Sequence, residues 1–264
     1  MPLRLSLVLL AAWIACTDAR GDDAPAVNTA IVPAPACEKD FYNWDERHAA
    51  VKRAIAEGPV DLVFLGDSIT HMWGGKPESN RQSGQKVWDE FYAKRNAVNM
   101  GFGWDRTQQA LWRVQNGEFE GIRPKVAVVL IGTNNLTGHN VRENTNDEIV
   151  AGVRAVCSAI REKSPETRIL LLGLFPRGAD PANPHRGRIR AINTELAKLD
   201  GKDGISFLDI GDKFLEKDGT FRAGLAPDHL HLSEQGYRTW AAAIEPALSR
   251  LLVEPAEQAK NETE

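Results

Sequence analysis

Residues 60–70 read Val-Asp-Leu-Val-Phe-Leu-Gly-Asp-Ser-Ile-Thr, an apolar run that ends in Gly-Asp-Ser. Apolar residues are nearly continuous from Val60 to Leu65, which is typical of a strand covered on both faces of a parallel sheet. Ser68 therefore follows the end of a buried strand. Ligands of open parallel sheets bind beyond the carboxyl ends of the strands, so this serine is a candidate site residue.

Four further apolar runs follow, and segments with helical spacing of apolar residues separate them. The other predicted strands are Ala97–Gly101, Lys125–Gly132, Arg168–Leu174 and Ile205–Ile210. The predicted helices include Trp88–Tyr92, Thr107–Val114, Ile149–Ile160, Ile189–Leu199 and Tyr237–Leu252. This alternation predicts an α/β fold with a five-stranded parallel sheet and helices on both faces.

Candidate helix caps and prolines support these boundaries. Asp105 is predicted to cap the helix that starts near residue 107, with Gln108 three residues later, and Ser233 to cap the last helix. Pro176 and Pro184 bracket a loop after the fourth strand.

Residues 1–19 are predicted to be a signal peptide. Arg4 supplies the positive start, residues 5–14 form an apolar run too short to span a bilayer, and small residues follow up to Ala19. The protein is therefore expected to be exported, either periplasmic or secreted. A lipoprotein signal ending before Cys16 is the alternative, which Trp13 disfavours because Leu is usual at that position.

The remaining chain divides into three predicted parts. Residues 20–36 are polar and rich in proline, which predicts a loose linker, residues 37–253 form a single domain, and residues 254–264 form a polar tail. The net charge of −4 favours neither nucleic acid nor an anionic membrane as a partner. Cys37 and Cys157 either form a disulfide or remain separate thiols, and the sequence favours separate thiols.

Candidate catalytic residues stand at two distant places in the chain. Ser68 follows the first strand, and Asp228 and His231 lie in the loop that enters the last helix. A histidine that removes the proton of a serine, and a carboxylate that orients the histidine, together make the serine nucleophilic. Taken alone, Ser68 is as easily a helix cap. His229 is the rival base, but its spacing from Asp228 directs it elsewhere.

A reaction at Ser68 also needs donors for the negative oxygen of a tetrahedral intermediate. The candidates are the backbone N–H of Ser68, a backbone N–H in the Gly101–Trp104 turn, and the side chain of Asn134. For Asn134 the alternative is a turn asparagine. No metal site and no cofactor are predicted, because His48, His71, His139 and His185 lack metal-ligand spacing. His71 is expected either to line the pocket or, more in keeping with its position, to be exposed.

The motifs resemble those of the SGNH (GDSL-type) hydrolases, and within them the catalytic subunits of platelet-activating-factor acetylhydrolase type Ib and their bacterial relatives. The resemblance covers residues 60–252 and rests on Gly66-Asp67-Ser68, Asn99-Met100-Gly101, Thr107–Arg113, Asn116-Gly117-Glu118, Ile122–Lys125, Gly132–Asn135, Leu174–Gly178 and Asp228–Ser233. It implies a flavodoxin-like three-layer α/β/α fold and cofactor-free ester hydrolysis.

The resemblance also assigns roles to residues. Ser68 would be the nucleophile, Asp228 and His231 would complete the triad, and Asn134 would donate to the oxyanion. Asp67, Gly101, Trp104 and Asn135 are expected at the substrate site. The resemblance further implies a homodimer, although no surface stripe in the sequence requires one.

Two departures from the family pattern stand out. Trp104 occupies the position where relatives have a glycine whose N–H binds the oxyanion, so that donor survives only if the backbone there suits a residue with a Cβ. Its indole would narrow the pocket or offer a stacking surface for a sugar. The loop Gly74–Gly84 is longer than expected, and it either overhangs the site or is an ordinary surface loop.

These observations predict a serine esterase that removes short acyl groups, with acetyl as the expected group and an O-acetylated carbohydrate as the expected substrate. One alternative is a phospholipid-type short-chain ester, which the lack of an extended apolar surface disfavours. A second alternative is a carbohydrate-binding module with a decayed site, and a third is acyl transfer to an alcohol in place of water.

Overall fold

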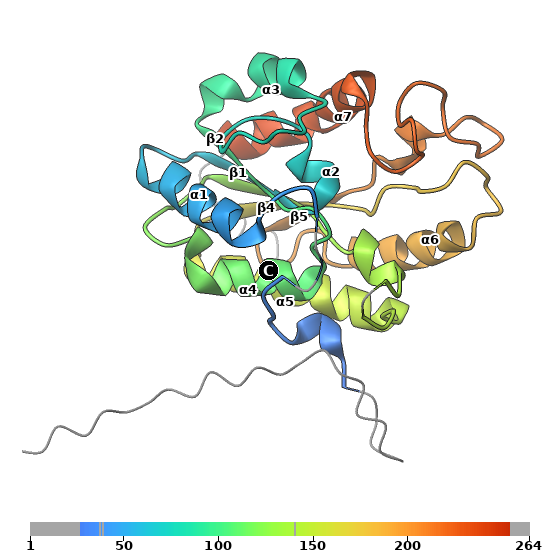
Figure 1. Ribbon diagram of the computed structural model, residues 1–264, viewed down its shortest axis with the longest axis horizontal. Coiled ribbons are helices and arrows are strands. Elements are labelled where there is room, and N and C mark those ends of the chain that lie inside the picture. The colour runs from blue at the N-terminus through green and yellow to red at the C-terminus, as the bar shows by residue number, and fades with distance from the viewer. Residues whose placement is uncertain (1–26, 37, 39, 140, 254–264) are drawn as a thin grey trace, which may run out of the picture.

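The computed structural model describes residues 27–36, 38, 40–139 and 141–253. Five parallel strands form one sheet in the order β2-β1-β3-β4-β5 (Figure 1). The strands are β1 (Leu62–Gly66), β2 (Ala97–Gly101), β3 (Val126–Leu130), β4 (Arg168–Leu172) and β5 (Ile205–Leu208). The predicted fold class is confirmed, and each strand lies within a predicted apolar run.

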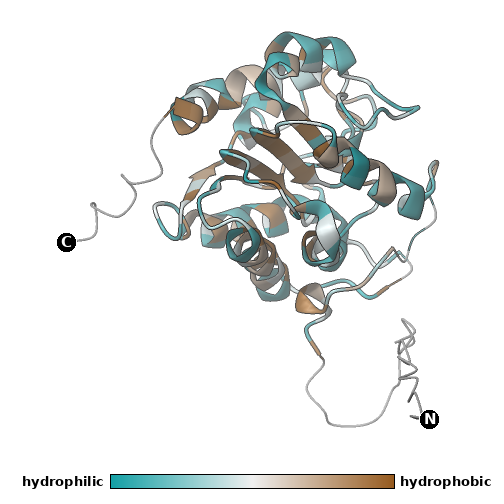
Figure 2. Cartoon of the chain, turned by 90° about the vertical axis from the view of Figure 1, so that its left-hand side faces the viewer, coloured by the Kyte–Doolittle hydropathy of each residue, from teal (hydrophilic) through white to brown (hydrophobic). Residues whose placement is uncertain are grey.

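Helices cover both faces of the sheet. On one face α3 (Gln85–Phe91) packs against α7 (Glu234–Val253), and on the other lie α4 (Thr107–Arg113), α5 (Asn146–Lys163) and α6 (Pro184–Ala197) (Figure 1). The strands between them are the most hydrophobic part of the ribbon, and the outer helix faces are hydrophilic (Figure 2). Short helical turns are η1 (Thr29–Ile31), η2 (Ala93–Arg95), η3 (Val114–Glu118), η4 (Thr133–Leu136) and η5 (Gly211–Phe214).

The register of β1 with its neighbours β2 and β3 places the ends of these three strands side by side. Gly66, the last residue of β1, lies opposite Gly101 of β2 and Leu130 of β3. Every residue of β1 is buried, because helices lie on both sides of its Val, Phe and Leu side chains. The segments that follow β1, β2 and β3 therefore leave the sheet at one edge.

Two helices were not among the predicted elements. The first is α1 (Trp44–Ala56), which contacts β2 and η3 and whose buried face includes Trp44, Val51 and Ile55. Arg47 is buried on the same face, donating to the carbonyl of Gly101 at 2.6 Å, so the apolar stripe is interrupted in sequence. The second is the single-turn helix α2 (Ser68–His71).

The described part of the predicted loose linker is packed against the domain. Ala30 is fully buried in η1, its carbonyl accepts a hydrogen bond from Thr107 Oγ1 at 2.9 Å, and the N–H of Ala34 donates to the carbonyl of Gln108. The packed body therefore begins before residue 37. Residues 1–26 and 254–264 lie outside the described residues, and with them the predicted signal peptide, Cys16 and the tail.

The helix caps follow the prediction in one case and shift in the other. Ser233 Oγ accepts from the N–H of Gly236 at the start of α7, as expected. The cap of α4 is Arg106 and not Asp105, because the Asp105 carboxylate is held by Trp44 Nε1 and Arg113 Nε.

The pairing of Cys37 with Cys157 stays a prediction. Cys157 is buried in α5, but Cys37 lies outside the described residues. In the described ranges, no helix combines the length and apolar character that crossing a membrane requires.

Candidate active site

Ser68 begins α2, and Asp67 alone separates it from Gly66, the last residue of β1. Asp67 caps this helix, with its Oδ1 accepting from the N–H of Ile69 at 2.9 Å. Gly66 is required at this turn because a Cβ there would lie 2.2 Å from Thr70 Oγ1 and 2.6 Å from the carbonyl of Leu130. The serine hydroxyl is thereby held at the carboxyl edge of the sheet, with 8% of the residue exposed.

The structure brings Ser68, His231 and Asp228 into one hydrogen-bonded chain. Ser68 Oγ lies 2.9 Å from His231 Nε2, and His231 Nδ1 lies 2.6 Å from Asp228 Oδ2. Asp228 Oδ1 also accepts the backbone N–H groups of Leu230 and His231, which fixes the turn that carries both residues. A nucleophile, a base and an orienting carboxylate in this geometry are equipped for acyl transfer.

The electrostatics of Asp228 suit an ionised carboxylate. Partial burial by itself would raise its pKa, but the hydrogen bonds from the His231 side chain and backbone outweigh burial and bring the pKa below its ordinary value. His229, the rival base, has φ of 58°, and its ring packs edge-on against Phe221. It takes no part in the chain from Ser68 to Asp228.

Three candidate oxyanion donors lie after β1, β2 and β3. Asn134 is buried in η4 and uses one amide hydrogen to bind the carbonyl of Asp105 at 2.9 Å, which leaves the second hydrogen to donate. Among the described residues, no acceptor is recorded for the backbone N–H of Ser68 or of Trp104. In the described part of the chain, these N–H groups are therefore available as donors.

Trp104 adopts the left-handed backbone conformation that its glycine-like position demands. Its φ is 62°, which a residue with a Cβ adopts only at a cost of about 1–2 kcal/mol. The partly buried indole contacts the ring of His139 in a tilted arrangement, with centroids 5.0 Å apart and 31° between the ring planes. Asp105, the next residue, is buried between Trp44 and Arg113, and burial raises its pKa to about 6.

The other residues expected at the substrate site are buried. Asp67 is 1% exposed, and burial raises its pKa to about 7. Gly101 packs so closely on α2 that a Cβ would lie 2.2 Å from the backbone nitrogen of His71. Asn135 is fully buried and joins α4 to the start of α5 through Thr107 and Asn144. Asp67, Gly101 and Asn135 thus contact other parts of the protein and support the site from within.

His71 differs from the expectation of an exposed side chain. It is 1% exposed, and its Nδ1 accepts a hydrogen bond from the N–H of Gly103. Burial, with help from Arg47 and Arg113, lowers its pKa to about 2, so the ring is neutral.

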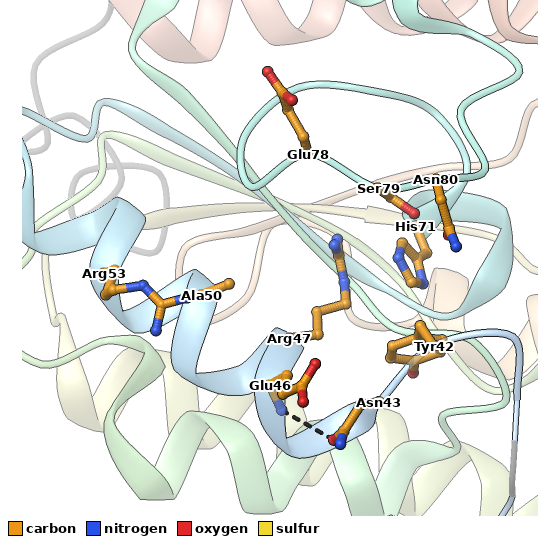
Figure 3. Close-up of a pocket in the computed structure, with 10 residues that line it drawn as sticks. All are labelled: Tyr42, Asn43, Glu46, Arg47, Ala50, Arg53, His71, Glu78, Ser79 and Asn80. Carbon is orange, nitrogen blue, oxygen red and sulfur yellow. Dashed lines mark hydrogen bonds between the residues drawn. The ribbon is translucent and has the colours of Figure 1, made fainter.

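Tyr42 is not among the residues predicted from sequence, although its hydroxyl donates to the carbonyl of Gly103 at 3.0 Å. The two residues are 61 positions apart, and no motif connects them. Tyr42 and His71 lie together beside a cavity of about 360 Å³ between α1 and residues 78–80 (Figure 3).

The loop Gly74–Gly84 lies on the surface near Tyr42 and His71. Its tip is largely exposed, and Lys76 is tied to the edge strand β2 by a bridge to Val98. The guanidinium of Arg81 lies 4.5 Å from the ring centre of Phe41, and Phe41 in turn contacts His71. The loop thus approaches the turn after β2. No group of His, Cys, Asp and Glu suited to a metal ion occurs in the part of the chain that the structure describes.

Residues 64–239 match the sequence model of the GDSL-like lipase/acylhydrolase family. The chain belongs to this family. It is accordingly an ester-bond hydrolase.

Individual relatives agree with the family assignment. The GDSL-like chain is 37% identical over 236 residues to platelet-activating factor acetylhydrolase IB subunit alpha1 from Bos taurus, an alignment that covers 89% of this chain and 93% of the relative. It is similar in fold to a GDSL-like lipase from Bacteroides thetaiotaomicron (TM-score 0.61, 18% identity, 78% of this chain and 97% of the other). It is also similar to the acetyl xylan esterase AlAXEase (TM-score 0.58, 20% identity, 71% and 98%).

The relatives correct the prediction of location. An exported, periplasmic or secreted protein was expected from the apolar run at residues 5–14, and this prediction is wrong, because the curated relatives are platelet-activating factor acetylhydrolase IB subunits, which argue against export. A short apolar run followed by small residues is a compositional signal, and such a run is weaker evidence than similarity over most of the chain.

Proposed function

We propose that this GDSL-like hydrolase cleaves short-chain acyl esters, acetyl esters above all, with Ser68 as nucleophile. The observation that carries the proposal is the continuous hydrogen-bonded chain from Ser68 Oγ through the imidazole of His231 to Asp228 Oδ2. Ser68, His231 and Asp228 are separated by up to 163 positions in sequence, and their convergence has no evident structural purpose.

In the acylation step, Ser68 Oγ attacks the ester carbonyl carbon while His231 Nε2 takes the hydroxyl proton. The carbonyl oxygen becomes negative and accepts hydrogen bonds from the N–H groups of Ser68 and Trp104 and from Asn134 Nδ2. The intermediate then collapses, and the C–O bond to the alcohol breaks as His231 returns the proton to the departing oxygen. Asp228 stays ionised throughout and stabilises the transient imidazolium.

Deacylation repeats these steps with water in place of the serine. His231 removes a proton from water, the resulting oxygen attacks the acyl carbon, and Ser68 leaves with the proton that His231 returns. A sugar hydroxyl could replace the water, which would make the reaction a transfer, and adding acceptor alcohols would reveal this by partitioning of the acyl group.

We further propose an O-acetylated carbohydrate as the substrate. The partly exposed indole of Trp104 and the exposed ring of His139, tilted at 31° to each other, present an aromatic surface beside the proposed oxyanion donors. Sugar rings stack well on such surfaces. The names of two similar proteins, an acetylhydrolase and an acetyl xylan esterase, support acetyl as the acyl group.

A phospholipid-type ester is the second candidate, and the 37% identity to a platelet-activating factor acetylhydrolase subunit favours it. Comparing acetylated xylooligosaccharides with a short-chain phospholipid ester distinguishes the two. For a sugar substrate, Trp104→Gly should lower kcat/KM for the oligosaccharide by roughly 3–10-fold more than for p-nitrophenyl acetate, because it removes one stacking surface. An equal loss on both esters would refute the sugar proposal.

The test of the nucleophile is Ser68→Ala. The variant should keep the fold, lose hydrolysis of p-nitrophenyl acetate by at least about 10³-fold, and no longer react with a fluorophosphonate probe. Mass spectrometry of the labelled wild type should locate the probe on Ser68. Full activity of the folded variant would refute the proposal, and sugar binding without turnover by the wild type would favour the binding-module alternative.

A further inference from the structure

We propose that Tyr42 and His71 are positioning residues that clamp the Gly103–Trp104 turn, so that the N–H of Trp104 stays directed at the oxyanion. The inference rests on the proposed function, and it assigns a task to two side chains that do not touch the substrate. It also explains how a tryptophan is held in a left-handed backbone conformation.

Tyr42 and His71 each bind one backbone polar group of Gly103. Tyr42 Oη donates to the Gly103 carbonyl at 3.0 Å, and His71 Nδ1 accepts from the Gly103 N–H at 3.2 Å. The carbonyl of Gly103 and the N–H of Trp104 belong to the same planar peptide group. A hydrogen bond that fixes this carbonyl therefore fixes the direction of the neighbouring N–H.

The two clamping side chains also support each other. Their rings meet edge to face with centroids 4.6 Å apart, and Figure 3 shows them next to one another at the start of α1 and the end of α2. Burial, reinforced by Asp105, raises the pKa of Tyr42 well above its ordinary value, so the hydroxyl keeps its proton and donates. His71 is neutral for the reason given above, so its Nδ1 can accept.

The clamp acts against a real tendency of the turn to relax. Trp104 has a φ of 62°, and its Cβ disfavours that conformation. At Gly103 a Cβ would lie 1.9 Å from Asp40 Oδ2 and 3.0 Å from the Tyr42 ring, so a side chain there would displace the Asp40 carboxylate and press on Tyr42. The turn is packed tightly under the segment that carries Tyr42, and this packing keeps the strained residue in place.

A hydrogen bond to the Gly103 carbonyl also polarises the peptide group, which makes the Trp104 N–H a stronger donor. Complete loss of one oxyanion donor lowers kcat by about 10²–10³-fold. Loosening the clamp should cost less than complete loss. We therefore expect Tyr42→Phe to lower kcat roughly 10-fold with KM within about twofold, since the donor acts on the transition state more than on the bound ester.

The matched control is Tyr92→Phe. Tyr92 is fully buried in the aromatic core, and its hydroxyl has no hydrogen-bond partner among the described residues. Both variants lose one buried hydroxyl, but only Tyr42→Phe should lose kcat. Equal kcat in the two variants, or a Tyr42→Phe effect confined to KM, would overturn the inference.

The strain argument is tested in the Trp104→Gly background. Glycine needs no restraint at positive φ, so Tyr42→Phe should there lower kcat by a factor of about three or less. An equal loss in both backgrounds would show that Tyr42 does not restrain Trp104. Thermal melting of each variant separates unfolding from misalignment of the donor.

His71 offers a second route should Tyr42→Phe not fold. His71→Leu removes the acceptor for the Gly103 N–H and should lower kcat, whereas His71→Asn keeps an acceptor near the position of Nδ1 and should restore much of it. Equal kcat in the two variants would contradict the clamp. Failure of the proposed function would look different, because the wild type would then be inactive or Ser68→Ala would stay active.

Discussion

Asp67 is a buried carboxyl group whose charge is only partly compensated. Its Oδ1 accepts from the N–H of Ile69, but its Oδ2 has no hydrogen-bond partner among the described residues. Burial raises its pKa to about 7, and Asp105 adds to this rise, while Arg177 opposes it. Near neutral pH the group therefore titrates next to the proposed nucleophile.

This raised pKa predicts a pH-dependent stability. Between pH 3.8 and about 7 the folded protein keeps a proton on Asp67 that the unfolded chain releases, so the free energy of unfolding falls as pH rises through this window. Asp67→Asn keeps the helix cap and removes the titration. Relative to wild type, the variant should gain on the order of 2–4 kcal/mol between pH 4 and pH 8, measured by urea denaturation.

The exposed Asp147 in the first turn of α5 provides the control. Asp147→Asn removes one carboxylate from an exposed position and so controls for the loss of a negative charge as such. If the difference between wild type and Asp67→Asn were independent of pH, Asp67 would have an ordinary pKa in the folded protein.

At this scale, local motifs made Ser68, Asp228 and His231 predictable, because each stands in a short run with its own chemistry and at the end of an element. Tyr42 could not be predicted, since its role depends on a contact with Gly103 that only the folded chain creates. His71 was misjudged for the same reason: it follows Ser68 in a turn that looks exposed in sequence and is covered by Phe41 and Tyr42.

At the scale of elements, the position of the proposed nucleophile depends on how closely α2 lies on β2. Gly101 at the end of β2 makes this approach possible, because its missing Cβ leaves space for the backbone of Thr70 and His71. Arg47 and Arg113 hold β2 from the other direction by donating to the carbonyls of Gly101 and Met100. The strand end and the helix thus form one rigid corner.

Gly101→Ala should disrupt this corner. The added Cβ would lie 2.2 Å from the nitrogen of His71 and 2.5 Å from the carbonyl carbon of Thr70, both backbone atoms that cannot move aside cheaply. We expect a loss of about 1–3 kcal/mol in the free energy of unfolding, together with reduced kcat as α2 shifts. Chemical denaturation and steady-state kinetics measure the two effects.

Gly58→Ala is the matched control for that substitution. A Cβ at Gly58 has nothing within 4 Å, and the residue lies in an exposed turn before β1. This variant should differ from wild type by no more than about 0.5 kcal/mol. Similar destabilisation by both substitutions would mean that loss of glycine flexibility, and not the clash, is responsible.

Elements with unbroken apolar patterns were predictable, and elements that bury charge were not. All five strands lie within predicted runs, since parallel strands covered on both faces leave a continuous apolar signal. Helix α1 was missed because Arg47 occupies a buried position in its stripe. The start of α4 was predicted correctly, but its N-cap is Arg106 and not Asp105, because buried Arg113 and Trp44 bind the carboxylate that was expected to cap the helix.

At the scale of the whole molecule, the sheet order explains why residues far apart in the chain converge. β1 lies between β2 and β3, so the loops after these three parallel strands share one edge, and α7 begins at that same edge. Strand, helix and site positions follow from this topology. What sequence patterns did not reveal is the path of the segment before the domain, whose few apolar residues carry no periodicity.

That segment, residues 27–36, should contribute to stability because it covers α4 and α5. Ala30 is fully buried, Gly152 of α5 leaves space for its carbonyl, and Thr107 and Gln108 bind it by hydrogen bonds. A chain that starts at residue 27 serves as the reference, because it keeps the whole segment. Removing residues 1–36 should lower the melting temperature by several degrees, because it removes these hydrogen bonds and exposes apolar surface on both helices.

Ala30→Asp in the full chain should reproduce the loss by preventing docking, whereas Val27→Asp, at a side chain already exposed, should not. If the chain lacking residues 1–36 melted like the full chain, the segment would rest on the domain without stabilising it.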